Sequence, residues 1–268
     1  MRLHTSSAFG GPRTAEIPAA RRSLLGRRAL FGAMVLLLVL ALVLPAVPQP
    51  AHYHAFADQR GWAGWPHAAG VLSNLGFVLA GCMGLVSLRR VGAARMGGTA
   101  RAMCMLFFVG LLSSGAGSAV YHWAPQDGSL VWDRLGMSLA FAGLLGLAVQ
   151  TRLDDASARA TAASVLLAAP LGVLIWARTG NVLPWALVQA GGMLLVGGLA
   201  FLAPRRRALP LGLGWVLGLY ALAKLLELSD AAVFAATGGL VSGHSLKHVM
   251  AAAAAWPVLQ ALRKLRTS

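Results

Sequence analysis

The chain has 268 residues, of which 57% are hydrophobic and 12% are charged, whereas a soluble domain carries roughly 25% charged residues. This composition excludes an ordinary soluble domain and indicates a membrane protein. Its 23 basic residues outnumber its 8 acidic ones, but they lie between apolar runs, so the excess indicates membrane orientation rather than a nucleic-acid partner.

The N-terminal region has two parts. Residues 1–28 are polar and carry six arginines, which predicts a disordered, basic cytoplasmic tail. Residues 29–47 form the first apolar run, which ends at a proline cluster. Because this run is long for the apolar core of a signal sequence, we expect an uncleaved transmembrane helix, with a cleaved signal sequence as the alternative.

Seven further apolar runs each approach the roughly 20 residues that a helix needs to cross a bilayer. Glycines recur inside them, which suits close helix packing in lipid. The sequence therefore predicts an all-α fold: a polytopic membrane helical bundle of seven core transmembrane helices plus one extra N-terminal transmembrane helix. The core domain covers residues 58–262 and precedes a cytoplasmic tail at 263–268; its expected spans are residues 69–88, 102–122, 131–150, 160–177, 184–203, 211–227 and 244–262.

The charges predict the orientation of these spans. If the N-terminus is cytoplasmic, 18 of the 23 basic residues fall on the cytoplasmic side together with three acids, and the outer side keeps five of each sign. This distribution follows the positive-inside rule. We therefore expect both termini in the cytoplasm. The Ala/Gly/Arg-rich composition is typical of bacteria, which makes the expected location the inner membrane with a periplasmic outer face.

Five residues with chemically useful side chains are expected at one depth. Ser118 and His122 stand four residues apart near the end of one span, so they share a helix face. Asp133 begins the next span, and His244 and His248 repeat the four-residue spacing at the start of the last one. The predicted topology brings all five into the outer half of the bundle. Ionisable groups inside a membrane are costly, so their convergence indicates a functional site.

The residue types suit a zinc site. Three imidazoles from two helices can ligate zinc and leave a fourth position open for water, as in catalytic sites. Asp133 would accept a proton from that water, and the Ser118 hydroxyl would donate to the developing oxyanion. A structural role is the alternative for each residue: a histidine at a helix end is often only interfacial, Ser118 can serve helix packing, and Asp133 can pair with Arg134.

Three motifs at these positions resemble the alkaline ceramidases and, more broadly, the CREST superfamily of seven-helix membrane hydrolases, which also includes adiponectin-type receptors. They read G-A-G-S-A-V-Y-H, D-R-L-G-M and G-H-S-L-K-H, and an earlier L-S-N-L (Ser73-Asn74) resembles a Ser-Asn of the family's first core helix. The resemblance covers residues 58–262. It implies zinc bound by His122, His244 and His248, with catalytic roles for Asp133 and Ser118. It also implies a membrane lipid substrate, a ceramide-like amide that is split into a fatty acid and a sphingoid-type amine.

The chain departs from this family in one respect. Alkaline ceramidases carry an acidic calcium-binding cluster before the first core helix, and here only Asp58 is found in that region, so no calcium site is expected. Asp58 and Arg60 are expected to form a loop salt bridge or a substrate-entry contact. Lys224 and Glu227 should pair on one helix face, while Lys247 should either neutralise an acid or meet a substrate headgroup.

The sequence leaves rival functions open. A non-catalytic seven-helix lipid receptor is the main alternative, because the same superfamily contains receptors. An esterase or another lipid hydrolase is a second, since ester and amide cleavage pass through similar oxyanions. A proton-coupled transporter is weaker, because the inner halves of the spans are almost uniformly apolar. Headgroup, acyl length and oligomeric state are not encoded in these patterns.

Overall fold

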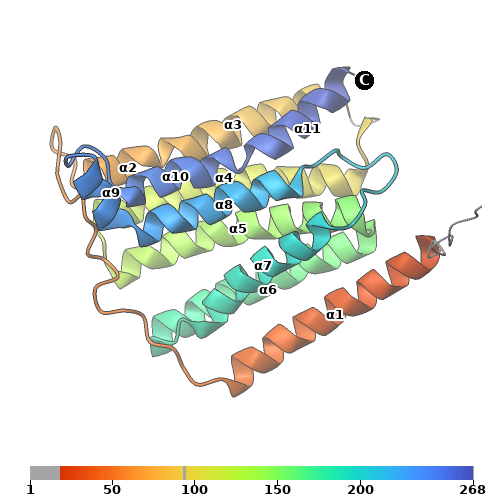
Figure 1. The fold of residues 1–268 in the computed structure, drawn as a ribbon, viewed down its shortest axis with the longest axis horizontal. Coiled ribbons are helices and arrows are strands. Elements are labelled where there is room, and N and C mark those ends of the chain that lie inside the picture. The colour runs from red at the N-terminus through yellow and green to blue at the C-terminus, as the bar shows by residue number, and fades with distance from the viewer. Residues whose placement is uncertain (1–18, 93–94, 268) are drawn as a thin grey trace, which may run out of the picture.

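The computed structural model describes residues 19–92 and 95–267, and within these ranges the chain is a bundle of helices without a β-strand. This confirms the predicted all-α membrane bundle. Figure 1 shows the helices lying roughly parallel or antiparallel along one axis. Their bounds are α1 (Ala19–Val43), α2 (Ala68–Ser73), α3 (Leu75–Arg90), α4 (Gly98–Trp123), α5 (Asp127–Arg152), α6 (Asp155–Thr179), α7 (Leu183–Ala200), α8 (Leu213–Leu228), α9 (Asp230–Ala236), α10 (Gly243–Ala253) and α11 (Trp256–Thr267).

Six helical segments of the described chain are long and apolar enough to cross a membrane: α1 from Leu24, α2 with α3, and α4 to α7. The last two expected spans are helical but differ from the prediction. The helix α8 has only 16 residues. The final span is divided into α10 and α11, because Pro257 has no N–H to donate to the helix and its ring clashes with a carbonyl one turn earlier.

The N-terminal helix is peripheral. Only 6% of its apolar window is buried inside the protein, and Figure 1 shows it on the outside of the bundle beside α6 and α7. It begins at Ala19 rather than near residue 29, so part of the predicted tail is helical. The remainder of that tail, residues 1–18, lies outside the described residues. At the other terminus, α11 continues through most of the predicted tail to Thr267.

The centre of the bundle is the close pair α4 and α5. A Cβ atom added at Gly110, Gly117 or Gly143 would collide with the backbone of the opposite helix. The absent side chains therefore allow the two backbones to touch, as expected for small residues in membrane bundles. Gly117 meets the Trp132 carbonyl and the Asp133 backbone nitrogen. This contact sets Ser118 next to Asp133.

The bundle has two ends that differ in composition, and we name them by their residues. The histidine end holds the end of α4 and the beginnings of α5 and α10; the arginine end holds Arg101, Arg152 and Arg205 together with the C-terminus (Figure 1). The segment 44–67 crosses the histidine end. It is fixed there by hydrogen bonds from Gln49 and His54 to Asp127, of 3.0 and 3.1 Å.

Candidate metal centre

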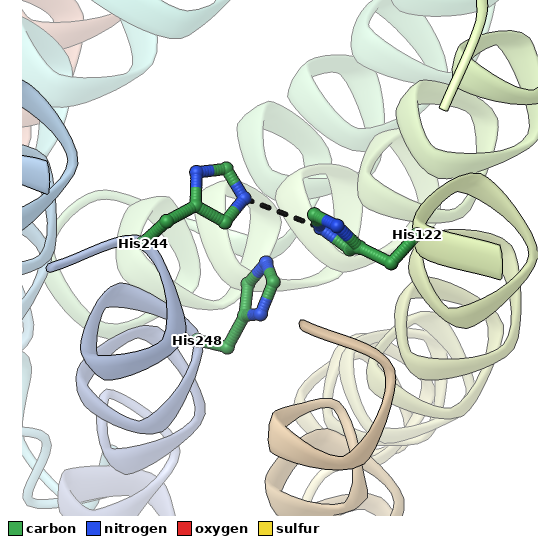
Figure 2. Close-up of side chains that lie close together, drawn as sticks. All are labelled: His122, His244 and His248. Carbon is green, nitrogen blue, oxygen red and sulfur yellow. Dashed lines mark hydrogen bonds between the residues drawn. The ribbon is translucent and has the colours of Figure 1, made fainter. Parts of the chain in front are cut away.

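The three predicted histidine ligands meet at the histidine end. His122 lies in the last turn of α4, and His244 and His248 lie one turn apart on α10. All three are buried, and the centroids of their rings are 4.9, 4.9 and 5.0 Å apart, which is a nearly equilateral triangle. One ring nitrogen of each lies within 4.8 Å of the others. Figure 2 shows the three side chains pointing toward a common centre.

The spacing of these nitrogens fits a metal ion. The Nε2 atoms of His122 and His244 are 3.2 Å apart. Two nitrogens bound to one tetrahedral zinc at about 2.0–2.1 Å would be separated by about 3.3 Å. Imidazole nitrogens are also ligands that suit zinc, copper, iron and nickel. The group can therefore hold a metal ion.

A hydrogen bond to Ser73 sets the tautomer of His248. The Ser73 hydroxyl donates to the Gly70 carbonyl at 2.9 Å and lies 2.8 Å from Nδ1 of His248. Because a hydroxyl has one hydrogen, Nδ1 must be the donor in the second contact. The Nε2 atom of His248 is then left with a free lone pair, which is the form that a metal requires. Asn74 also donates to the Gly70 carbonyl, at 2.8 Å.

The position of His244 depends on Asp230. One carboxylate oxygen of Asp230 accepts from the His244 backbone N–H at 2.7 Å, and the other accepts from Ala57 N–H at 2.9 Å. The Ser242 hydroxyl caps the first turn of α10 by accepting from Ser245 N–H at 3.1 Å. Asp230 thus ties the segment 44–67 and the start of α10 together at the metal centre.

Phe56 covers the centre and was not expected from the sequence. Its ring centroid is 4.3 Å from that of His244 and 4.8 Å from that of His122, and the side chain is buried. The only sequence signal was the abundance of aromatic residues in the segment 44–67. On the opposite side, a Cβ at Gly70 would lie 3.0 Å from Nδ1 of His122, so glycine makes room for that ring.

Ser118 and Asp133 lie beside the histidines, in the wall of a cavity that His248 also lines. Ser118 is buried and within hydrogen-bonding reach of the Asp133 carboxylate. Asp133 keeps partial exposure because it faces the cavity. The structure thus brings together the five residues singled out by the sequence, while their chemical roles stay predictions.

The cavity is largely apolar away from these residues. It runs between α3, α4, α5, α7, α8 and α10, and its volume is about 140 Å³. A mostly apolar lining with a few polar groups at one end is the chemistry that an apolar chain with a polar group would fit. The apolar lining includes Phe107, Leu111, Phe141, Leu144 and Ala254.

The expected ion pairs are confirmed. Lys224 and Lys247 both contact Glu227, at 2.7 and 2.5 Å, and all three line the cavity. In the segment 44–67, Arg60 and Asp58 form a salt bridge at 2.8 Å. The hydrogen bond from the Arg60 guanidinium holds the pKa of the Asp58 carboxyl below its usual range.

Comparison with known proteins adds no assignment. No protein-family model matches the chain, and no curated protein matches it significantly.

Proposed function

We propose that the protein is a zinc-dependent membrane hydrolase that cleaves the amide bond of a ceramide-like lipid. One observation carries the proposal: a single cavity joins His248, Asp133 and Ser118 to an apolar space inside a bundle of membrane-type helices. Catalytic groups at one end of an apolar cavity suit a substrate with a polar amide and a long chain. The motif resemblance to alkaline ceramidases supports the same assignment.

Zinc is the metal that the ligand set favours. His122, His244 and His248 would hold it through neutral imidazole nitrogens, and three protein ligands leave an open position, as in catalytic zinc sites. When bound, zinc polarises a carbonyl and lowers the pKa of water toward neutrality. The Ser73 hydroxyl would keep the His248 ring in the ligating form.

The remaining steps of the reaction are carried out by side chains of the protein. Asp133 acts as the general base that takes a proton from the attacking water and returns one to the leaving amine. The Ser118 hydroxyl, beside Asp133, donates a hydrogen bond to the oxyanion that forms on the amide carbonyl. The apolar walls hold the acyl chain. A carboxylate facing the cavity beside the histidines supports catalysis over lipid binding alone.

The orientation is part of the proposal. With both termini in the cytoplasm, the arginine end faces the cytoplasm and the histidine end faces outward, which in a bacterial inner membrane is the periplasm. The lipid then reaches the cavity from the outer half of the bilayer.

The proposal is tested with the purified full-length protein in detergent. Bound zinc is measured by elemental mass spectrometry, and release of fatty acid from ceramide is followed with and without a chelator. We expect about one zinc per chain, and activity that the chelator abolishes and zinc restores.

His248→Ala should lose both zinc and activity. The matched control is His52→Ala, which removes an exposed histidine from the segment 44–67 and should change neither. Full zinc occupancy in His248→Ala would remove that residue from the site. If no ceramide or other lipid amide is hydrolysed under any metal condition, the proposed activity is wrong.

A further inference from the structure

Arg134 is a buried cation whose hydrogen-bonding capacity is only partly used within the described residues. Its side chain lies two helical turns into α5, about 10 Å from the start of that helix, and it is 2% exposed. The Nη2 group donates to Gln49 at 2.7 Å. The Nε and Nη1 atoms are buried and have no hydrogen-bond partner in the described part of the chain. A buried arginine with unpaired donors is costly, so it indicates a function.

The guanidinium is held in a fixed position. It stacks on Trp176 with 3.9 Å between Cζ and the ring centroid, and Tyr53 lies on it at 5.5 Å. Stacking of this kind partly offsets the cost of burying the charge without using its N–H donors. Arg134 also lines the cavity that contains Asp133 and His248. The Arg134 side chain is therefore next to the space that a substrate would fill.

The charges around the cavity favour an anion. Its lining carries three cations against two carboxylates, which leaves one excess positive charge. Glu227 is shared by two of the cations in ion pairs. Asp133 forms no ion pair with Arg134 in the described chain, since both Nε and Nη1 of Arg134 are unpartnered. The charged lining residues are Asp133, Arg134, Lys224, Glu227 and Lys247.

We infer that the cavity binds a lipid with an anionic group, a carboxylate or a phosphate, and that Arg134 is the residue that recognises it. Carboxylate and phosphate oxygens are the natural partners of guanidinium N–H groups, and such charge-assisted hydrogen bonds are short and strong. The inference rests on the proposed function for its substrate class: the preferred substrate is an N-acyl lipid whose amine portion is acidic. A neutral ceramide offers Arg134 only uncharged oxygens, whose hydrogen bonds to a guanidinium are weaker.

The test separates binding from turnover. Metal-stripped protein, which cannot hydrolyse its ligand under the proposed mechanism, is titrated with three radiolabelled lipids of equal acyl length: N-palmitoylglycine, N-palmitoyl ceramide 1-phosphate and neutral N-palmitoyl ceramide. We expect the wild type to bind at least one acidic lipid more tightly than ceramide. The tighter of the two acidic lipids shows whether the anion is a carboxylate or a phosphate.

Arg134→Gln should weaken binding of the acidic lipid by about 10- to 100-fold and leave ceramide binding within about twofold. Arg134→Lys keeps the charge but loses the planar donors, so it should retain part of the preference for acidic lipid over ceramide. This second variant keeps the test valid if Arg134→Gln fails to fold. The matched control is Arg152→Gln. It removes an arginine of the same helix at the arginine end, where its donors already meet the Leu199 and Leu211 carbonyls, and it should leave the preference unchanged.

The outcomes distinguish this inference from the proposed function. If ceramide and the acidic lipids bind equally well, or if both Arg134 variants keep the wild-type preference, the inference is overturned even when ceramide is hydrolysed. If acidic lipids bind in an Arg134-dependent way and no lipid is hydrolysed in the zinc-loaded protein, the inference stands as a ligand assignment while the hydrolase proposal fails. With active protein, Arg134→Gln should raise KM for the acidic amide more than it lowers kcat.

Discussion

At the arginine end of the bundle, arginine side chains are paired with carbonyls and carboxylates at helix ends, whereas at the histidine end several buried polar atoms have no hydrogen-bond partner among the described residues. Arg101 donates to the Leu88 and Val91 carbonyls at 3.1 and 3.0 Å, which satisfies the last turn of α3. Arg205 contacts Asp155 at 2.8 Å. Such contacts satisfy helix ends that would otherwise be costly to bury. These arginines have a structural role in addition to any effect on membrane orientation.

At the histidine end the pattern is reversed. Nδ1 of His122 and two nitrogens of Arg134 are buried and without hydrogen-bond partners in the described chain, as is the hydroxyl of Tyr220 in the middle of α8. The arginine end has one such atom in the described residues, Oε1 of Gln150. Since most buried polar atoms in proteins are paired, the unpaired nitrogens of Arg134, a residue that lines the cavity, indicate a group kept for a ligand. The comparison predicts that mutations at the two ends will affect different properties.

The largest effect is expected from Asp133→Asn at the histidine end. Loss of the general base should lower the rate of lipid hydrolysis by about 10²- to 10⁴-fold. Zinc content should stay near one per chain, because Asp133 is outside the histidine cluster. The control is Asp127→Asn, which changes an exposed carboxylate in the first turn of the same helix and should keep most of the activity. Equal losses in the two variants would contradict the role of Asp133.

A smaller effect is expected from Ser73→Ala. Removing the hydroxyl that holds Nδ1 of His248 should weaken zinc binding by about 10- to 100-fold, as is usual for partners of metal-ligating histidines. Affinity is measured by competition with a chelator of known strength. Ser87→Ala, near the C-terminal end of α3 and away from the histidines, is the control. Unchanged affinity in Ser73→Ala would show that the hydrogen bond is not needed to orient the ring.

Arg152→Gln probes the arginine end. It removes hydrogen bonds to the Leu199 and Leu211 carbonyls and should reduce the free energy of unfolding by about 1–3 kcal/mol. Zinc affinity and lipid preference should not change. Thermal denaturation in detergent measures the loss of stability, and chelator competition measures the zinc affinity. A change in zinc affinity without a change in stability would contradict the separation of the two ends.

The smallest expected effect is on the dependence of folding stability on pH. The pKa of Asp58 is below its ordinary value of 3.8 because Arg60 hydrogen-bonds its carboxylate. Its contribution to stability is therefore complete above about pH 4 and is lost as the pH falls through the lowered pKa of the folded state. Arg60→Gln should make acid unfolding less steep in this range, measured by tryptophan fluorescence. Identical acid profiles would show that the salt bridge contributes nothing measurable.

The histidine cluster could be predicted from the sequence because helical spacing and the alternation of membrane spans both place these residues together. The four-residue spacing set His244 and His248 on one face of α10, and the alternation of spans brought that helix start to the depth of His122. The glycines of the spans predicted close helix packing in general; the structure shows it between α4 and α5, where it explains why Ser118 reaches Asp133.

Other features depend on contacts that no local pattern encodes. Phe56 and Asp230 reach the site through the path of the segment 44–67, which has no periodicity to predict it. The adjacency of Asp133 and Arg134 in the sequence also allows an ion pair between them. Neighbouring residues of a helix do not face each other, so Arg134 stacks on Trp176 while Asp133 faces Ser118 and the cavity.

The placement of Phe56 also bears on how fast the metal would exchange. Its ring lies against two of the three histidines, and the neighbouring Ala57 is tied to α10 through Asp230. An ion held at this centre could leave on that side only after the ring is displaced. We therefore expect the dissociation rate of bound zinc to follow the opening rate of the segment 44–67, so that metal exchange is slow even where the equilibrium affinity is modest.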